Sequence, residues 1–243
     1  GALRLVKKDI RTAKIVLNGG GAAGTAIGRL LVDCGAENLT VMLHHGTLCE
    51  GHDKNGRPLD RVQEALSKVT NREKRLGSLA DIVKGADVLL GVSAAGAFTQ
   101  EMIRSMAPDA VVFAMANPVP EISYADAKAA GARVAGTGRS DTPNQVNNVN
   151  VFPGVFRGAI DVRAREINEA MKVAAVRAIA ELIPEEELRE DYVVPNAFDK
   201  RVAPAVAAAV ARAAVETGVA RAPKDPEVVL RETYLRVNGV PMD

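Results

Sequence analysis

The sequence has no tryptophan, and aromatic residues make up only 3% of it. Its core must therefore be aliphatic, because few large aromatic side chains are available to fill it. It has only two cysteines, Cys34 and Cys49, which are too few and too isolated for a disulfide framework or a zinc site. We therefore expect a protein built around Ala, Val, Ile and Leu that depends on neither disulfides nor structural zinc.

Long apolar runs and an excess of charge of one sign are also missing. No apolar stretch approaches the roughly 20 residues of a membrane-spanning helix, and the first residues, GALRLVKKD, lack the apolar segment of a signal peptide. The net charge of +1 gives no general attraction to nucleic acid or to an anionic membrane. These absences predict a cytoplasmic protein that binds neither nucleic acid nor membrane.

What the sequence does contain is a glycine-rich turn between a strand and a helix, in the stretch KIVLNGGGAAGTAIGRLL. Gly19, Gly21 and Gly24 form a G-x-G-x-x-G pattern directly after the apolar strand. In dinucleotide-binding sheets the first glycine permits the tight turn, the second leaves room for the pyrophosphate, and the third lets helix and strand pack closely. The N–H groups at Ala22 and Ala23, at the positive end of the helix, then face the anion. The pattern thus favours a dinucleotide site over a glycine-rich packing turn.

Strands and helices alternate through the first 140 residues of the chain. Apolar segments predict five strands, at residues 14–17, 38–43, 87–91, 110–116 and 132–137. Amphipathic segments, two of them beginning at the caps Ser78 and Thr99, predict helices between the strands. This alternation predicts an α/β fold, a Rossmann-like, doubly wound and mostly parallel sheet.

The composition changes after this point. Residues 139–158 are polar, rich in asparagine and in turn-forming residues, and predict a long loop. Helices are expected over residues 163–183, which Pro184 ends, and over residues 201–217. The last 20 residues are expected to form a helical or extended tail.

We expect one NAD(P)-binding domain over residues 1–243. Its Rossmann core would occupy about residues 14–140, its asparagine-rich loop and C-terminal helices residues 141–221, and its tail residues 222–243.

Candidate ligand-binding residues follow the predicted strands, because open parallel sheets bind ligands at the carboxyl ends of their strands. The turn Gly91–Gly96, with Ser93 and Ala94, would pass under the nicotinamide ribose or the pyrophosphate, unless it is a plain turn. Asn117 ends another strand, and its amide offers two donors and an acceptor to a carboxylate or a carboxamide. On its own, such an asparagine is more often a turn residue.

The segment after residue 140 is unusually dense in amides, at Asn144, Gln145, Asn147, Asn148 and Asn150. Amides can bind a polar or anionic substrate without adding a titrating charge. They can equally stabilise turns in a long loop. The sequence pattern leaves both interpretations open.

No conventional catalytic or metal-binding cluster is evident. His44 and His45 are adjacent and so point in different directions, and His52 lies in a polar loop, which argues against a metal site. One rule of NAD-binding sheets also fails, since the acidic residue expected about 20 residues after the glycines is Leu43 here. No arginine stands at that position either, although a protonated histidine beside it could meet a 2′-phosphate.

Several of these stretches resemble one family. KIVLNGGGAAGTAIGRLL, GVSAAGAFTQEMI, FAMANPVPEI, the long run TGRSDTPNQVNNVNVFPGVFRGAIDVRAREINEAMKVAA, and PNAFDKRVAPAVAAAVARAAVETGVA are similar to the NAD(P)-binding half of bacterial malic enzymes. The resemblance covers about residues 5–221, and the run NQVNN…FPGVFRGA is its most specific part. The chain departs from the family pattern at Leu43, where an aspartate is usual, and at Ala95, where a proline is usual.

The resemblance implies NAD or NADP as cofactor, carried at its pyrophosphate by Gly19, Gly21 and Gly24. It implies that Asn117 and Asn148 contact the carboxylates of L-malate, which is oxidised and decarboxylated to pyruvate. The family's catalytic Tyr and Lys, and its acidic ligands for Mg²⁺ or Mn²⁺, belong to a preceding segment. We therefore expect neither catalytic nor metal-binding residues in this chain, and a homodimer for the full-length protein.

Two other functions remain open from the sequence. A stand-alone nucleotide-binding or regulatory domain without catalysis is favoured by Leu43 and by the lack of the catalytic segment. A different amino-acid or hydroxy-acid dehydrogenase with the same fold is disfavoured by the asparagine-rich run.

Overall fold

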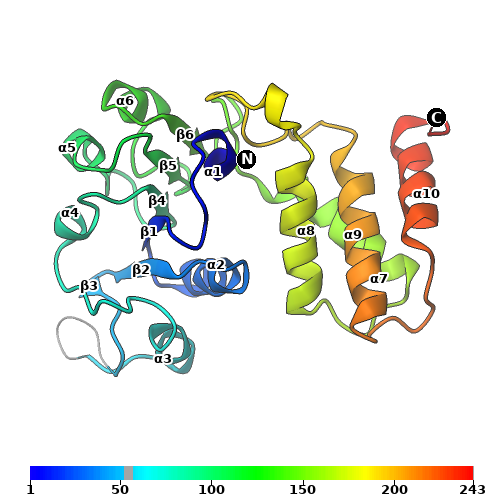
Figure 1. Ribbon diagram of the computed structural model, residues 1–243, viewed down its shortest axis with the longest axis horizontal. Coiled ribbons are helices and arrows are strands. Elements are labelled where there is room, and N and C mark those ends of the chain that lie inside the picture. The colour runs from blue at the N-terminus through cyan, green and yellow to red at the C-terminus, as the bar shows by residue number, and fades with distance from the viewer. Residues whose placement is uncertain (52–56, 243) are drawn as a thin grey trace. The chain divides into compact units, whose positions relative to one another are not determined.

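The computed structural model describes residues 1–51 and 57–242, which form two compact units (Figure 1). One unit is Ala2–Asn144, and the other is Gln145–Asp243 together with Gly1. Each unit has a hydrophobic core of its own. That residues 1–243 act as a single NAD(P)-binding domain stays a prediction.

The first unit is built on a six-stranded sheet with the order β3-β2-β1-β4-β5-β6. All neighbouring strands are parallel except β3, which pairs antiparallel with β2. The prediction of a Rossmann-like, doubly wound, mostly parallel sheet is confirmed. The strands are β1 (Lys14–Asn18), β2 (Asn38–Leu43), β3 (Gly46–Thr47), β4 (Val88–Gly91), β5 (Val111–Ala114) and β6 (Val134–Thr137).

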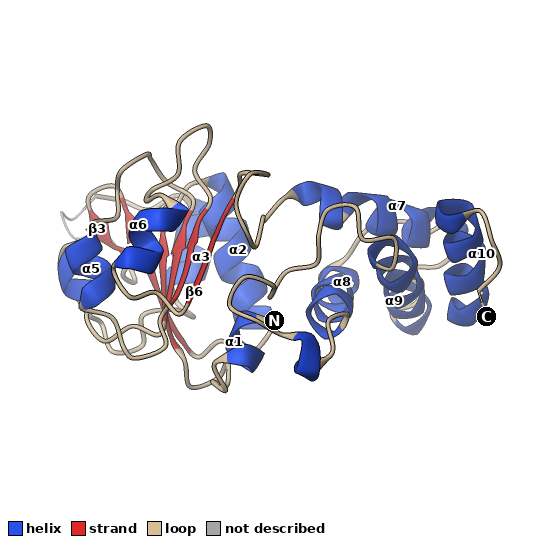
Figure 2. Ribbon diagram, turned by 90° about the horizontal axis from the view of Figure 1, so that it is seen from above, coloured by secondary structure: helices blue, strands red, loops and turns tan. Residues whose placement is uncertain are grey.

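Helices cover both faces of this sheet, with α2 and α3 on one face and α4, α5 and α6 on the other (Figures 1 and 2). The side chains of Ser78 and Thr99 cap α4 and α5 as predicted, by accepting hydrogen bonds from backbone N–H groups. The helices of this unit are α1 (Ala2–Leu5), α2 (Ala22–Asp33), α3 (Arg61–Ser67), α4 (Leu79–Ile82), α5 (Gln100–Arg104) and α6 (Tyr124–Ala129).

Alternate residues of the strands reach the two helical layers. Val16 of β1 joins the core cluster that also holds Ile82 of α4 and Ile103 of α5. The next residue, Leu17, points the other way and lies 3.6 Å from the Cβ position of Gly28 in α2. This period of two, buried on both faces, is why the strands read as continuous apolar runs in the sequence.

The second unit is helical and is organised around α9, which packs against α7, α8 and α10. Its core is made mainly of Val and Ala side chains. The elements are a 3₁₀ turn η1 (Asn148–Asn150), α7 (Phe152–Asp161), α8 (Glu169–Glu181), a 3₁₀ turn η2 (Glu185–Glu187), α9 (Val202–Glu216) and α10 (Pro226–Asn238).

Two expectations for this region are wrong. The predicted loop over residues 139–158 contains most of α7, which was missed because Pro153 and two glycines weaken the helix signal. Pro153 lies in the first turn, where proline is tolerated. The helix predicted from residue 163 begins only after the cap Asn168, because Arg163 has a left-handed backbone with φ of 49°.

The glycines of α7 lie where that helix approaches α9 most closely. A Cβ on Gly154 would stand 2.7 Å from Cγ1 of Val206, and one on Gly158 would stand 3.0 Å from Cβ of Val210. The glycine spacing of FPGVFRG therefore reflects tight helix packing.

We expect Gly158→Ala to lower the free energy of unfolding by about 1–2 kcal/mol, because overpacking outweighs the better helix propensity of alanine. Urea unfolding followed by circular dichroism measures this change. Arg177→Ala, on the exposed side of α8, is the control and should stay within about 0.5 kcal/mol of the parent. An unchanged Gly158→Ala protein would contradict the close packing.

Candidate functional site

The sheet order reverses between β1 and β4, and this is where open α/β sheets bind their ligands. A cleft of about 830 Å³ lies there, among the described residues of the first unit. Its volume falls within the roughly 300–1,000 Å³ of small-molecule sites. Of the predicted cofactor residues, the cleft brings together Gly19, Gly21, Leu43, Ser93 and Ala94.

The glycines of the turn differ in what surrounds them. Gly19 has φ of 119°, and a Cβ there would stand 2.5 Å from the carbonyl oxygen of Val92. A Cβ on Gly24 would collide with the carbonyl oxygen of Gly19. At Gly21, in contrast, no described protein atom lies within 4 Å of the Cβ position. Gly19 and Gly24 therefore allow close packing, while Gly21 leaves open space in front of the N-terminus of α2.

The N-terminus of α2 offers donors to this space. Gly21 is the N-cap and has an extended backbone. Because it has no side chain, it cannot cap the first N–H groups of the helix. The first N–H groups of the helix, on Ala22 and Ala23, are orphan donors at the positive end of its dipole. The hydroxyl of Thr25 donates to the carbonyl oxygen of Gly21 at 3.0 Å and holds the turn in place. This donor set fits a pyrophosphate.

The end of β2 forms another wall of the cleft. The side chain of Leu43 lies over Gly20, whose missing Cβ makes room for it. Gln63 of α3, which the sequence analysis did not single out, donates from Nε2 to the carbonyl oxygen of Gly20 at 3.0 Å. Arg57 also lines the cleft, and its Nη1 contacts Nε2 of His45.

Histidines do not form a metal site in the part of the chain that is described. The rings of His44 and His45 meet edge to face at 4.6 Å, and His52 lies outside the described residues. Among residues 1–51 and 57–242, no group of three or more His, Cys, Asp and Glu side chains could hold a metal ion. None of the described helices is long and apolar enough to cross a membrane.

The ends of β4 and β5 are joined by a buried carboxylate that sequence reasoning missed. Glu121 is 0% exposed and accepts hydrogen bonds from Ser93 and from the N–H group of Ala116. The Ser93 hydroxyl in turn accepts from Nδ2 of Asn18 at 2.8 Å. A single acidic residue within the apolar run VPEI was the available signal, because such a residue is rarely buried without partners.

Asn117 lies after the end of β5 and is joined to Pro118 by a cis peptide bond. It is not among the residues that line the cleft. Its amide lies against Gly138 after β6, where a Cβ would stand 3.2 Å away. Asn148, the other predicted substrate residue, belongs to the second unit and begins η1.

Three other amides of the asparagine-rich run serve the local structure. Asn144 donates to the carbonyl oxygen of Ala135 at 2.9 Å, and Asn150 donates to that of Pro195 at 2.8 Å. The side chain of Asn147 caps η1. For these residues the turn and packing interpretation holds, which leaves Gln145 and Asn148, and of these two the family resemblance implies a substrate contact only for Asn148.

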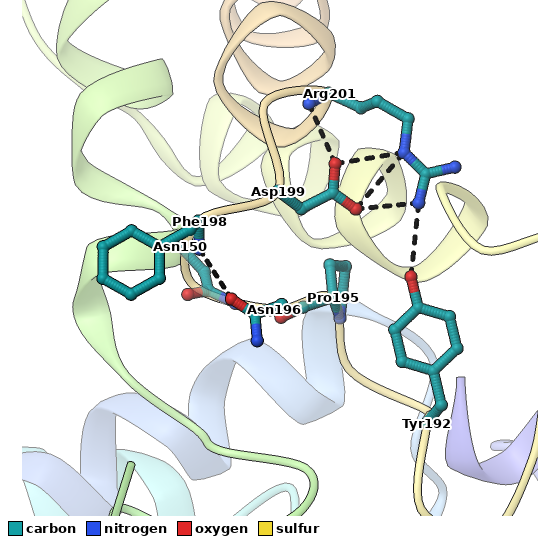
Figure 3. Close-up of polar contacts among 7 residues, drawn as sticks. All are labelled: Asn150, Tyr192, Pro195, Asn196, Phe198, Asp199 and Arg201. Carbon is teal, nitrogen blue, oxygen red and sulfur yellow. Dashed lines mark hydrogen bonds and ion pairs between the residues drawn. The ribbon is translucent and has the colours of Figure 1, made fainter.

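The segment PNAFDKR is held in place by its own side chains and by contacts with Asn150 and Tyr192 (Figure 3). Asp199 accepts from Nη2 of Arg201 at 2.7 Å, and the same nitrogen donates to the Tyr192 hydroxyl at 3.2 Å. Partial burial works to raise the pKa of Asp199, but the hydrogen bonds and charge of Arg201 outweigh it, so that this pKa lies below its usual value. Phe198 in this segment is 90% exposed.

The strand order, the glycine turn and the uncapped helix at the switch point together define a Rossmann-type dinucleotide-binding fold. A family model described as "Malic enzyme, NAD binding domain" matches residues 1–215. The chain belongs to this family, which confirms the resemblance found in its sequence.

The curated relatives include NAD-dependent and NADP-dependent malic enzymes. The chain is 56% identical to the bifunctional malic/malolactic enzyme of Bacillus subtilis, over 96% of this chain and 56% of that protein. It is 47% identical to the NAD-dependent malic enzyme of Geobacillus stearothermophilus, over 90% of this chain and 45% of that protein. The NADP-dependent malic enzyme of Haemophilus influenzae is 43% identical over 91% of this chain. The chain thus spans about half the length of the first two.

Solved malic enzymes share the fold. The Entamoeba histolytica enzyme superimposes with a TM-score of 0.89 at 36% identity, over 98% of this chain and 51% of that one. The Pyrococcus horikoshii enzyme gives a TM-score of 0.85 at 39% identity, over 97% of this chain and 55% of that one.

Gly21→Val should weaken nucleotide binding at least tenfold, or about 1.4 kcal/mol, while the fold survives, because the new side chain fills space that is open to a ligand and touches no protein atom. Calorimetric titration with NAD and NADP measures the loss. Ala26→Val adds the same side chain to an exposed position of α2 and should bind as the parent does. Retained binding in folded Gly21→Val would exclude the glycine turn as the pyrophosphate site.

Proposed function

We propose that this chain is the cofactor-binding portion of a malic enzyme, which converts L-malate and NAD(P) to pyruvate, carbon dioxide and the reduced nucleotide. The observation that carries the proposal is the uncapped start of α2 under the open Gly21, at the switch point of a sheet that belongs to the malic-enzyme family. A bound nicotinamide cofactor supplies the hydride acceptor for C2 of malate.

The chain's own residues would bind and orient the dinucleotide. The N–H groups of Ala22 and Ala23 hold the pyrophosphate, with Gly19, Gly21 and Gly24 shaping the turn around it. Ser93 and Ala94 would lie beside the nicotinamide half of the dinucleotide, since they line the cleft after β4.

The substrate would be held by amides. We assign Asn117 and Asn148 to its carboxylates, because an amide N–H donates to an anion without a titrating charge of its own. The acidic ligands of Mg²⁺ or Mn²⁺ and the Tyr and Lys that move protons would come from outside these residues. For the full-length protein we propose a homodimer and, from its composition, a cytoplasmic location.

The nucleotide preference would be set at the end of β2. Leu43 offers no acceptor to the hydroxyls of the adenosine ribose, whereas His45 and Arg57 on the same wall can meet a 2′-phosphate. We therefore propose that NADP is bound at least as well as NAD.

Leu43→Asp should tighten NAD binding about tenfold, because hydrogen bonds to a charged acceptor contribute about 1.5–3 kcal/mol. It should weaken NADP binding by charge repulsion. Leu43→Asn, without the charge, is the matched control and should spare NADP. Titration of both nucleotides against the three proteins decides this, and an unchanged NAD affinity in Leu43→Asp would mean that the ribose binds elsewhere.

Residues 1–243 expressed alone should bind nucleotide but show no malate-dependent reduction of NAD or NADP with either Mg²⁺ or Mn²⁺, since the metal ligands and proton-transfer groups are assigned elsewhere. Absorbance of the reduced nicotinamide follows the reaction. The positive control is the same chain joined to the preceding half of a relative. Turnover by residues 1–243 alone would refute the assignment of the metal ligands and proton-transfer groups to another segment.

A further inference from the structure

Glu121 is a fully buried carboxylate at the carboxyl ends of the strands. Its Oε1 accepts from the backbone N–H of Ser93 at 2.7 Å and from the Ser93 hydroxyl at 3.0 Å. Its Oε2 accepts from the N–H of Ala116 at 2.9 Å. Burial of a carboxylate is costly unless such donors satisfy it. The carboxylate therefore joins the segment after β4 to the segment after β5.

The sheet is shaped to receive this carboxylate. Gly91 is the last residue of β4. A Cβ at this position would stand 2.6 Å from Oε1 and 2.8 Å from Oε2 of Glu121. Any other residue there would displace the carboxylate. Since the φ of Gly91 does not lie in the left-handed region, its backbone conformation does not require glycine. The space taken by Glu121 does.

The same chain segment binds the loop after β4 through its backbone. The N–H of Gly96 donates to the carbonyl oxygen of Pro120 at 3.3 Å, and that of Phe98 donates to the carbonyl oxygen of Glu121 at 3.1 Å. These two bonds do not involve the carboxylate. Removing the carboxylate should therefore shift Ser93 and Ala116 while the rest of the loop stays attached.

The location of these contacts indicates what they serve. A dinucleotide crosses the switch point with one mononucleotide on each half of the sheet. The glycine turn and the end of β2 take the adenosine half, so the ends of β4 and β5 take the nicotinamide half. Ser93 and the chain leading into Asn117 are the parts of that half that Glu121 holds.

We propose that Glu121 is a positioning residue for the nicotinamide half of the cofactor, acting through Ser93 and the Ala116–Asn117 segment. This inference rests on the proposed function, because it requires that the cleft bind a nicotinamide dinucleotide. It assigns the glycine turn to affinity for the pyrophosphate and Glu121 to the placement of the nicotinamide ring.

Glu121→Gln tests the proposal with little change of shape. An amide has one acceptor oxygen in place of two, so either the Ser93 contact or the Ala116 contact is lost. Gly91→Ala reaches the same carboxylate from the opposite side and leaves its charge in place. Leu89→Ala, at a buried core position of the same strand β4, is the control for general destabilisation.

The readout compares two pairs of ligands, NADH with ADP-ribose and NADPH with 2′-phospho-ADP-ribose, by calorimetry. The second member of each pair lacks only the nicotinamide. We expect Glu121→Gln and Gly91→Ala to bind the reduced dinucleotides about tenfold more weakly, or about 1.4 kcal/mol, and to bind the truncated ligands within twofold of the parent. Leu89→Ala should melt at a lower temperature with both affinities nearly unchanged.

The possible failures are distinguishable. If both ligands of a pair weaken equally in folded Glu121→Gln, or if neither changes, Glu121 has only a structural role and the inference is wrong. If the parent protein binds neither NAD(P)H nor the truncated ligands, the proposed function fails first. If Glu121→Gln does not fold, Gly91→Ala and Ser93→Ala carry the same comparison.

Discussion

The contact between the start of α2 and the turn after β1 is the constraint on which the candidate site depends. The helix can meet the strand at this distance only because Gly24 places no Cβ against the carbonyl oxygen of Gly19. That approach aims the N-terminal N–H groups of α2 into the cleft, where a pyrophosphate would find them. Around it, Thr25 and Gln63 bind the turn's carbonyl oxygens, so the donors stay free to face outward.

The other side of the cleft uses side chains for the same purpose. There the segments after β4 and β5 are held by the buried carboxylate of Glu121 and by the amide of Asn18. Glu121 does for the loop after β4 what helix packing does for the glycine turn, and Gly91 and Gly24 are glycines for comparable reasons. In both places a missing Cβ admits a group that holds the backbone beside the cleft.

Local patterns in the sequence predicted most of the first unit, and the reasons are visible in particular residues. Period-two burial and continuous apolar strands revealed the sheet, while Ser78 and Thr99 marked helix starts. The two-residue strand β3 is too short to leave a pattern, and α7 was hidden by Pro153 and its glycines. Glu121 could not be assigned, because its partners lie 28 and five residues away along the chain and meet it only in the fold.

The short strand β3 has a consequence for how copies of this protein can associate. Among the described residues it ends the sheet with two residue pairs, Met42 with Thr47 and Leu43 with Gly46. An edge strand of two residues presents almost no ladder of backbone donors and acceptors to a second chain. In the described part of the chain the β3 edge therefore offers little backbone for a second chain to pair with, and we expect subunits to associate there through side-chain surfaces instead of a shared sheet.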